Sequence, residues 1–140
     1  MKTEKPRILA IDYGARRIGI AITDPLRLFS IPLLTIPNDK DLWSNLLRIF
    51  DSYEIETVVI GYPLKESGGR SSSTEMVEKF RKELEKKISQ KILFVDERYS
   101  SEIAQQRILE TVPSKKKRKD KNLIDKNAAA VILQSYLDGA

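Results

Sequence analysis

Residues 7–23 read RILAIDYGARRIGIAIT, and this stretch decides the fold. Residues 7–12 form a short apolar run that stops at a carboxylate, as expected of a strand covered on both faces. Residues 13–16 supply a turn, and residues 17–23 then alternate isoleucine with small side chains. The pattern predicts two strands paired as a hairpin, with Asp12 at the end of the first strand.

The hairpin is followed by a third strand and a helix. A strand is expected over residues 29–36, where Pro32 favours a place at the edge of the sheet. Asn38 and Asp39 are good capping residues, and apolar side chains recur at helical spacing from Leu42 to Tyr53. The sequence therefore predicts a first helix that Asn38 and Asp39 cap.

Strands and helices alternate in the rest of the chain. We expect a buried strand over residues 57–60, a helix opened by the capping-box pattern of Ser72 and Glu75, a strand over residues 91–95, a helix from Ser100 or Ser101 to Glu110, and a last helix over about residues 123–137. This order predicts an α/β fold in which a mixed sheet carries helices on both faces, in a single domain spanning residues 1–140. The expected core contains Ile8, Leu9, Ile18, Ile20, Val58, Val59, Ile60, Leu93, Phe94, Ile132 and Leu133.

The composition limits the chemistry. The chain has 140 residues, which suits one domain with a real core. It contains no cysteine, which excludes disulfides, thiolate nucleophiles and cysteine-based metal sites. It contains no histidine, which excludes Ser-His-Asp and Cys-His catalysis and imidazole metal sites. Any catalysis must therefore depend on carboxylates, lysines or hydroxyls.

The positive charge is concentrated in one segment. The chain has 25 basic and 20 acidic residues, and residues 115–121 alone hold six bases and one acid, so the remainder has 19 of each sign. Such a run is either a solvated loop or an arm that meets phosphates. We expect a basic loop at about residues 112–122, whose candidate nucleic-acid-binding residues are Lys115, Lys116, Lys117, Arg118, Lys119 and Lys121.

The amino-terminal residues are polar, and no apolar run approaches the ~20 residues of a membrane span. The sequence also begins with no signal-peptide pattern. We therefore expect a cytoplasmic protein.

Carboxylates follow apolar segments at several points. They are Asp12, then Asp96 or Glu97, and Asp125 at the start of the last helix. Asp125 shares a helix face with Ala128, Ala129 and Ile132, which must pack on the sheet. Each acid alone has an ordinary structural explanation, because acids are common in turns and in the first turn of a helix.

As a group these carboxylates predict a metal site. Three of them at one end of a sheet would repel one another unless a cation lay between them, and oxygen ligands suit Mg²⁺ or Mn²⁺. Two such ions are the usual apparatus of phosphodiester hydrolysis. Either Asp96 or Glu97 could face the site, since neighbours on a strand point to opposite faces.

Short motifs follow one another along the chain: Ile11-Asp12-Tyr13-Gly14, Arg17-Ile18-Gly19-Ile20-Ala21, Gly61-Tyr62-Pro63-Leu64, Asp96-Glu97-Arg98-Tyr99-Ser100-Ser101 and Asp125-Lys126-Asn127-Ala128-Ala129 with Ile132-Leu133-Gln134-Ser135-Tyr136-Leu137. This set resembles the YqgF/RuvX family over residues 8–137. The resemblance implies a ribonuclease H-like fold: a five-stranded mixed sheet whose first three strands are antiparallel. Family members are described as Holliday junction resolvases and as nucleases that process the 5′ end of precursor 16S ribosomal RNA.

Carried over by position, the resemblance places the catalytic, metal-binding acids at Asp12, Glu97 and Asp125. Asp12 would bridge two metal ions, Glu97 would orient the water or complete one ion's shell, and Asp125 would close the other. Gly14 would leave room for a phosphate, with Arg16 in the same turn. Residues 68–71 would offer backbone N–H groups and the cation of Arg70 to a second phosphate, although a plain turn explains them equally well.

Other functions compete with this interpretation. An ATP-binding domain of the sugar kinase, actin and heat-shock chaperone type uses a similar Asp-x-Gly hairpin, but it needs two domains around the nucleotide. A binding module without turnover is a further alternative, against which the three acids argue. Between the nuclease functions we favour RNA processing, with resolution of four-way DNA junctions as the alternative. A resolvase requires a two-fold homodimer. No exposed apolar stripe compels a dimer, and the nearest candidates, Trp43 and Leu47, are better explained as the margin of the core.

Overall fold

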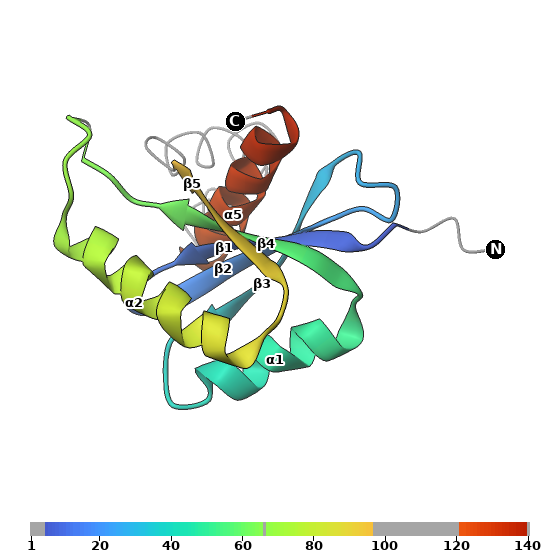
Figure 1. Cartoon of the computed structure of the whole chain (residues 1–140), viewed down its shortest axis with the longest axis horizontal. Coiled ribbons are helices and arrows are strands. Elements are labelled where there is room, and N and C mark those ends of the chain that lie inside the picture. The colour runs from blue at the N-terminus through green and yellow to red at the C-terminus, as the bar shows by residue number, and fades with distance from the viewer. Residues whose placement is uncertain (1–4, 66, 97–120, 140) are drawn as a thin grey trace.

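The computed structural model describes residues 5–65, 67–96 and 121–139. Its elements in chain order are β1 (Arg7–Tyr13), β2 (Arg17–Thr23), β3 (Ser30–Pro37), α1 (Leu42–Ser52), β4 (Ile55–Tyr62), α2 (Ser72–Lys87), β5 (Lys91–Asp96) and α5 (Lys121–Leu137) (Figure 1). The strands form a five-stranded sheet in the order β3-β2-β1-β4-β5. β2 pairs antiparallel with both β1 and β3, and β4 and β5 extend the sheet in parallel with β1. The predicted mixed sheet is confirmed.

Helices cover both faces of the sheet (Figure 1). On one face α1 and α2 bury Leu46 and Phe80 against a core that includes Leu9 and Ile11 of β1. On the other face α5 packs on Ile8 and Ala10 of the same strand. Successive residues of β1 therefore serve opposite cores, as expected of a strand covered on both sides.

Small side chains let α5 lie close to the sheet. Ala10 of β1 and Ala21 of β2 are paired across the strands, and Ala129 and Ala130 of α5 pack against them. All four are fully buried. Because alanine adds only one methyl group to the backbone, helix and sheet approach with little intervening volume.

Most of the expected core residues are buried, but Leu93 and Phe94 are only partly so. Both lie on β5, which is an edge strand with a neighbour on one side only. Leu93 packs beside the α5 core and Phe94 beside the α1–α2 core. An apolar strand at an edge thus leaves its side chains less covered than the sequence alone suggested.

Helix starts differ in detail from the prediction. α1 is capped at Asp41, without a side-chain hydrogen bond, and not at Asn38 or Asp39. The capping box of α2 is formed by Ser71 and Thr74, one residue before the predicted Ser72 and Glu75. In α2 the cap is fixed by the side chain that meets a free N–H group, and Ser71 and Ser72 are both suitable by sequence. Element boundaries are otherwise uncertain by a residue or two from sequence alone.

The predicted basic loop ends earlier than expected, because Lys121 and Asn122 already belong to α5. The helix predicted from Ser100 or Ser101 to Glu110 lies outside the described residues. Within the described residues, no helix has the length and apolar character needed to cross a membrane.

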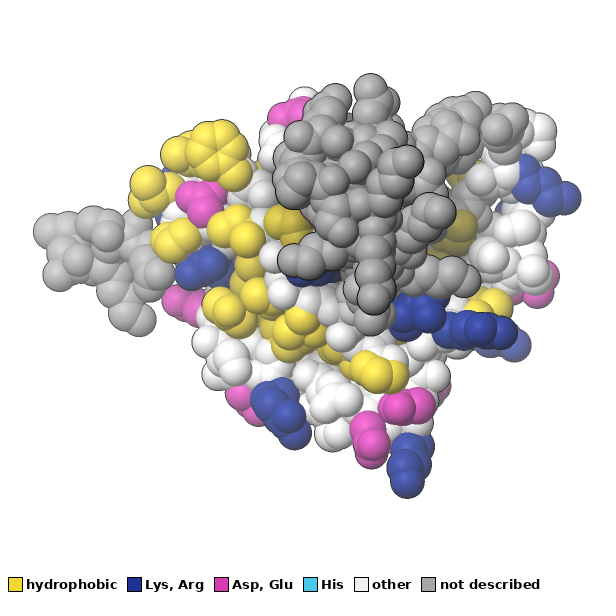
Figure 2. Space-filling view, turned by 180° about the vertical axis from the view of Figure 1, so that it is seen from behind, with side chains coloured by type: hydrophobic (Ala, Val, Ile, Leu, Met, Phe, Trp, Pro, Cys, Tyr) yellow, Lys and Arg dark blue, Asp and Glu magenta, His cyan; other side chains and the backbone are white. Residues whose placement is uncertain are grey.

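Exposed apolar side chains lie over the β2–β3 loop and β3. They are Leu26, Leu28, Phe29, Ile31 and Leu34. Figure 2 shows hydrophobic side chains gathered on this side of the molecule. Trp43, by contrast, stacks on Phe80 with ring centroids 5.3 Å apart, and Leu47 is half-buried. This surface lies on the β2–β3 loop and β3, and not on α1, which carries the candidates Trp43 and Leu47.

Candidate active site

Asp12 lies near the carboxyl end of β1, the middle strand of the sheet. Ile8 and Ala10 precede it at intervals of two and face α5, so the same alternation places Asp12 on the α5 face. Its side chain is half-buried. The apolar run and its terminal carboxylate, identified in the sequence, thus put one acid between the sheet and α5.

The positions beside Asp12 carry no side chains. Its cross-strand partner on β2 is Gly19. On the other side Ile11 is paired with Ile60 of β4, and the next residue along β4 is Gly61. The residues that flank Asp12 on the two neighbouring strands are therefore glycines, which place no side chain directly beside its carboxylate.

The turn after Asp12 depends on Gly14. A Cβ atom at this position would lie 2.6 Å from the carbonyl oxygen of Arg17, closer than real Cβ atoms come. The turn is also tied from outside: Asn38 Nδ2 donates to the carbonyl oxygen of Gly14 at 2.8 Å, and the Asn38 N–H donates to Arg16 O at 2.9 Å. Arg16 itself is exposed. Gly14 is thus needed because the backbone of Arg17 lies so close to it. That Gly14 also leaves room for a phosphate stays a prediction.

Asn38 is a site residue that the sequence analysis misassigned. It was expected to cap a helix, but its side chain holds the turn that follows Asp12. The hydrogen bond joins residues 24 positions apart, so no local pattern indicates it. Only the pairing of β3 with β2 brings the end of β3 beside this turn.

We expect Gly14→Ala to destabilise the protein by about 1–3 kcal/mol, because the new methyl group overlaps a backbone oxygen that cannot move without opening the hairpin. The measurement is the free energy of unfolding from denaturant titration. Gly69→Ala is the matched control: its Cβ would have ordinary contacts, the nearest at 3.6 Å. Equal unfolding free energies for the two variants would contradict the steric role of Gly14.

Helix α5 starts at the Asp12 end of the sheet. Near its other end, Gln134 Oε1 accepts from the Ser30 N–H at 3.3 Å. Ser30 pairs with Thr23, and Thr23 Oγ1 accepts a hydrogen bond from the Ile8 N–H near the start of β1. Gln134 of α5 therefore lies level with the first residues of β1. From Gln134 back to Asp125 the helix spans roughly 13 Å, about the length of β1 from Ile8 to Asp12.

The predicted buried face of α5 is confirmed, since Ala128, Ala129 and Ile132 are all buried. The backbone of Asp125 continues that face at spacings of three, four and seven. The side chain of Asp125 lies outside the described part of the chain, as does that of Lys121. That Asp125 points toward Asp12 therefore stays a prediction.

Asp96 and Glu97 are adjacent candidate acids, and the strand register shows which face of the sheet Asp96 occupies. Asp96 ends β5 opposite Tyr62 of β4, and the Tyr62 ring packs on Phe94 with centroids 4.6 Å apart. Phe94 belongs to the α1–α2 face, so Asp96 also lies on that face, away from Asp12. Val95, its neighbour, packs on the α5 side. Glu97 lies outside the described residues, as do Lys115, Lys116, Lys117, Arg118 and Lys119.

Arg70 lies in the connection between β4 and α2, at the same edge of the sheet as Asp12 but toward α2. Its guanidinium is exposed and forms an ion pair with Glu78 of α2. Gly68, in the same connection, has φ of 89°, which favours glycine. Among the described residues, no group of three acidic side chains could hold a metal ion.

The sequence comparison gives the family. A family model described as "RuvX: Holliday junction resolvase" matches residues 6–139. The chain belongs to the RuvX family. A relative from Porphyromonas gingivalis named "Putative pre-16S rRNA nuclease" is 43% identical over 134 residues, covering 94% of this chain and 96% of the relative. A relative of the same name from Phocaeicola vulgatus is 38% identical over 133 residues, covering 94% and 95%.

The structural comparison gives the fold. The Holliday junction resolvase of fowlpox virus superimposes with a TM-score of 0.57 at 17% identity, covering 96% of this RuvX chain and 99% of the viral one. The same enzyme in complex with substrate Holliday junction DNA gives a TM-score of 0.56 at 17% identity, covering 94% and 97%. At this level of identity the likeness concerns the fold alone. The expected ribonuclease H-like fold is confirmed.

Proposed function

We propose that this RuvX chain is a nuclease that hydrolyses phosphodiester bonds and processes the 5′ end of precursor 16S ribosomal RNA. The observation that carries the proposal is the place of Asp12, at the end of the middle strand, on the face covered by α5, with glycines on both sides. The names of relatives 38–43% identical over nearly the whole chain favour ribosomal RNA as the substrate.

The proposal includes a divalent metal, Mg²⁺ or Mn²⁺, held by Asp12, Glu97 and Asp125. The chain has no histidine or cysteine, so its ligands are oxygen atoms, which these cations prefer. Two bound ions would lower the pKa of the attacking water and stabilise the leaving oxygen. The chain's own contribution would be to hold the carboxylates: Asp12 on β1, Asp125 on α5, and Glu97, which follows β5 in the sequence.

A second candidate function is resolution of four-way DNA junctions, favoured by the description of the family model. A resolvase makes two symmetric cuts, so this function would require a two-fold homodimer. The fold does not choose between RNA and branched DNA as the partner. RNA processing requires no second copy and would place the protein in the cytoplasm, where ribosomal RNA is made.

The deciding experiment compares cleavage of a precursor 16S ribosomal RNA fragment with cleavage of a four-way DNA junction. Purified protein is assayed on both with Mg²⁺, with Mn²⁺ and with a chelator. The proposal expects cleavage near the 5′ end of the RNA that stops when the metal is removed. Cleavage of the junction alone would support a resolvase, and binding without cleavage of either would support a binding module.

The basic loop should act through its charge. It leads directly into α5, which begins at Lys121 near the Asp12 end of the sheet. Replacing Lys115, Lys116, Lys117 and Lys119 by Ser should weaken binding about equally for all sequences. If three of them contact phosphates, the slope of log affinity against log salt should shrink by roughly two for single strands and nearly three for duplex.

Fluorescence anisotropy over a salt series measures this slope. The cleavage rate at saturating substrate should change little, because these contacts would stabilise the bound substrate and the transition state equally. Replacing the exposed Lys79 and Lys82 of α2 by Gln is a control for general loss of charge. An unchanged salt slope in the loop variant would show that these lysines do not contact phosphates and that the loop is a solvated connector.

A further inference from the structure

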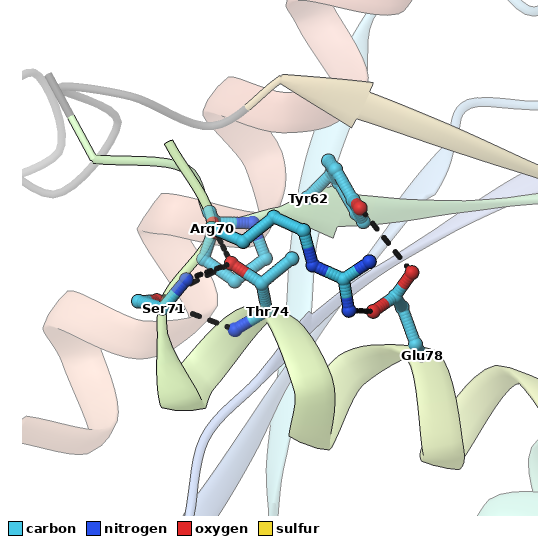
Figure 3. Close-up of polar contacts among 6 residues, drawn as sticks. Tyr62, Arg70, Ser71, Thr74 and Glu78 are labelled. Atoms are coloured by element: carbon cyan, nitrogen blue, oxygen red, sulfur yellow. Dashed lines mark hydrogen bonds and ion pairs between the residues drawn. The ribbon is translucent and has the colours of Figure 1, made fainter. Parts of the chain in front are cut away.

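The connection between β4 and α2 is fixed at both ends. Thr74 Oγ1 on α2 donates to the carbonyl oxygen of Pro63, which follows β4 directly. Ser71 N–H donates to Thr74 Oγ1 at 3.0 Å, and Ser71 Oγ accepts from the Thr74 N–H at 3.4 Å (Figure 3). The backbone next to Arg70 is therefore held to the end of the sheet and to the first turn of the helix.

A closed turn precedes Arg70. The Gly68 N–H donates to Lys65 O at 2.7 Å, and the Lys65 N–H donates to Gly69 O at 2.9 Å. Together with the Ser71–Thr74 contacts, these bonds leave the Arg70 backbone little freedom. The side chain, in contrast, is 59% exposed. Arg70 thus combines a fixed starting point with a guanidinium that can change partner.

Glu78 holds the guanidinium in its present place. One carboxylate oxygen pairs with Arg70 and the other accepts a hydrogen bond from the Tyr62 hydroxyl at 3.4 Å (Figure 3). Tyr62 is the last residue of β4 and packs on Phe94. Glu78 is therefore oriented by a residue of the sheet edge, and Arg70 is neutralised when no ligand is bound.

The energetics make this pair easy to exchange. Ion pairs exposed to water contribute little to stability, and Glu78 remains 31% exposed here. A phosphate accepts two parallel hydrogen bonds from a guanidinium and carries a full negative charge. A phosphate near Tyr62 would thus replace the carboxylate at Arg70, while Glu78 kept its hydrogen bond to Tyr62.

We propose that Arg70 binds a backbone phosphate of the nucleic acid on the α2 side of the sheet edge at which β1 and β4 end, and that Glu78 is the positioning residue that holds Arg70 until this phosphate replaces it. The proposal rests on the proposed nuclease function. β1 and β4 are neighbouring parallel strands that end at the same edge. A strand of nucleic acid that crosses this edge from the α5 face to the α2 face would therefore meet Asp12 and Arg70 in turn. The negative charge of Glu78 also repels phosphates. It therefore disfavours binding of any nucleic acid whose phosphates do not reach Arg70.

The test measures binding separately from cleavage, with a labelled single-stranded RNA oligonucleotide in chelator over a salt series. Arg70→Gln should weaken binding several-fold and reduce the salt slope by about 0.7, the loss of one phosphate contact. Glu78→Gln keeps an acceptor for Tyr62 but frees Arg70, so binding should tighten by about twofold to fivefold. Arg70→Lys should keep the salt slope.

Two comparisons separate this proposal from a general charge effect. Glu85→Gln is the matched control, since Glu85 pairs with Arg81 on the same helix and is exposed; RNA binding should not change. In an Arg70→Gln background, Glu78→Gln should tighten binding much less than in the wild type. Thermal melting of each variant checks the fold, and these surface substitutions should change it little.

Weaker binding by Glu78→Gln would show that the pair is a structural clamp and would overturn the proposal, as would an unchanged salt slope for Arg70→Gln. The proposed function is judged independently, by whether the wild-type protein cleaves RNA with Mg²⁺. Binding that follows the expected pattern without RNA cleavage would leave the Arg70 site standing and refute the RNA-processing function.

Discussion

Asp12→Asn should lower the rate of RNA cleavage by several orders of magnitude while the protein still folds. Asparagine has nearly the shape of aspartate and keeps a hydrogen-bonding oxygen, but it lacks the negative charge that would bridge two cations. Losing a metal-based contribution to the transition state has an effect of this size. The measurement is single-turnover cleavage of the precursor RNA fragment in Mg²⁺.

The same variant should be at least as stable as the wild type in chelator. Asp12 is half-buried at the position where further carboxylates are expected, and removing one charge relieves their repulsion. Asp51→Asn is the matched control, because Asp51 is exposed near the end of α1 and should affect neither property. Wild-type cleavage by Asp12→Asn in Mg²⁺ would rule out this site.

The sheet could be predicted because its central strands carry distinct local patterns. The alternation in residues 17–23 and the glycine turn before it fix the β1–β2 hairpin, and the structure shows that pairing with Asp12 opposite Gly19. Hydrophobic periodicity gave the face of α5 that is buried. The places of β4 and β5 in the sheet were not predicted, since pairing between distant parallel strands leaves no local signal.

Contacts between distant elements could not be predicted in the same way. The hydrogen bond from Asn38 to Gly14 depends on β3 returning beside the β1–β2 turn, and a capping residue is locally an equally good explanation. The Arg70–Glu78–Tyr62 contacts likewise require β4 and α2 to be placed first. Such contacts depend on tertiary geometry, whereas the strands and helices themselves can be predicted from the local spacing of apolar residues.

The register of β5 bears on a question that the sequence left open, namely which of two adjacent acids faces the site. Val95 packs on the α5 side, and Asp96 lies opposite Tyr62 on the α2 side. If the alternation continues for one more residue, Glu97 faces the same side as Asp12. Substitution of both acids, one at a time, tests this prediction.

Glu97→Gln should therefore abolish cleavage, with a loss of several orders of magnitude, while Asp96→Asn should cost less than about tenfold, or about 1.4 kcal/mol of transition-state stabilisation. Both substitutions remove one charge and keep the side-chain shape, so each is the control for the other. Single-turnover rates in Mg²⁺ give the comparison, and RNA binding in chelator should be similar for the two variants. A large loss from Asp96→Asn combined with near-normal cleavage by Glu97→Gln would mean that Asp96 is the ligand. The strand would then turn its last residue toward α5, against the pairing with Tyr62.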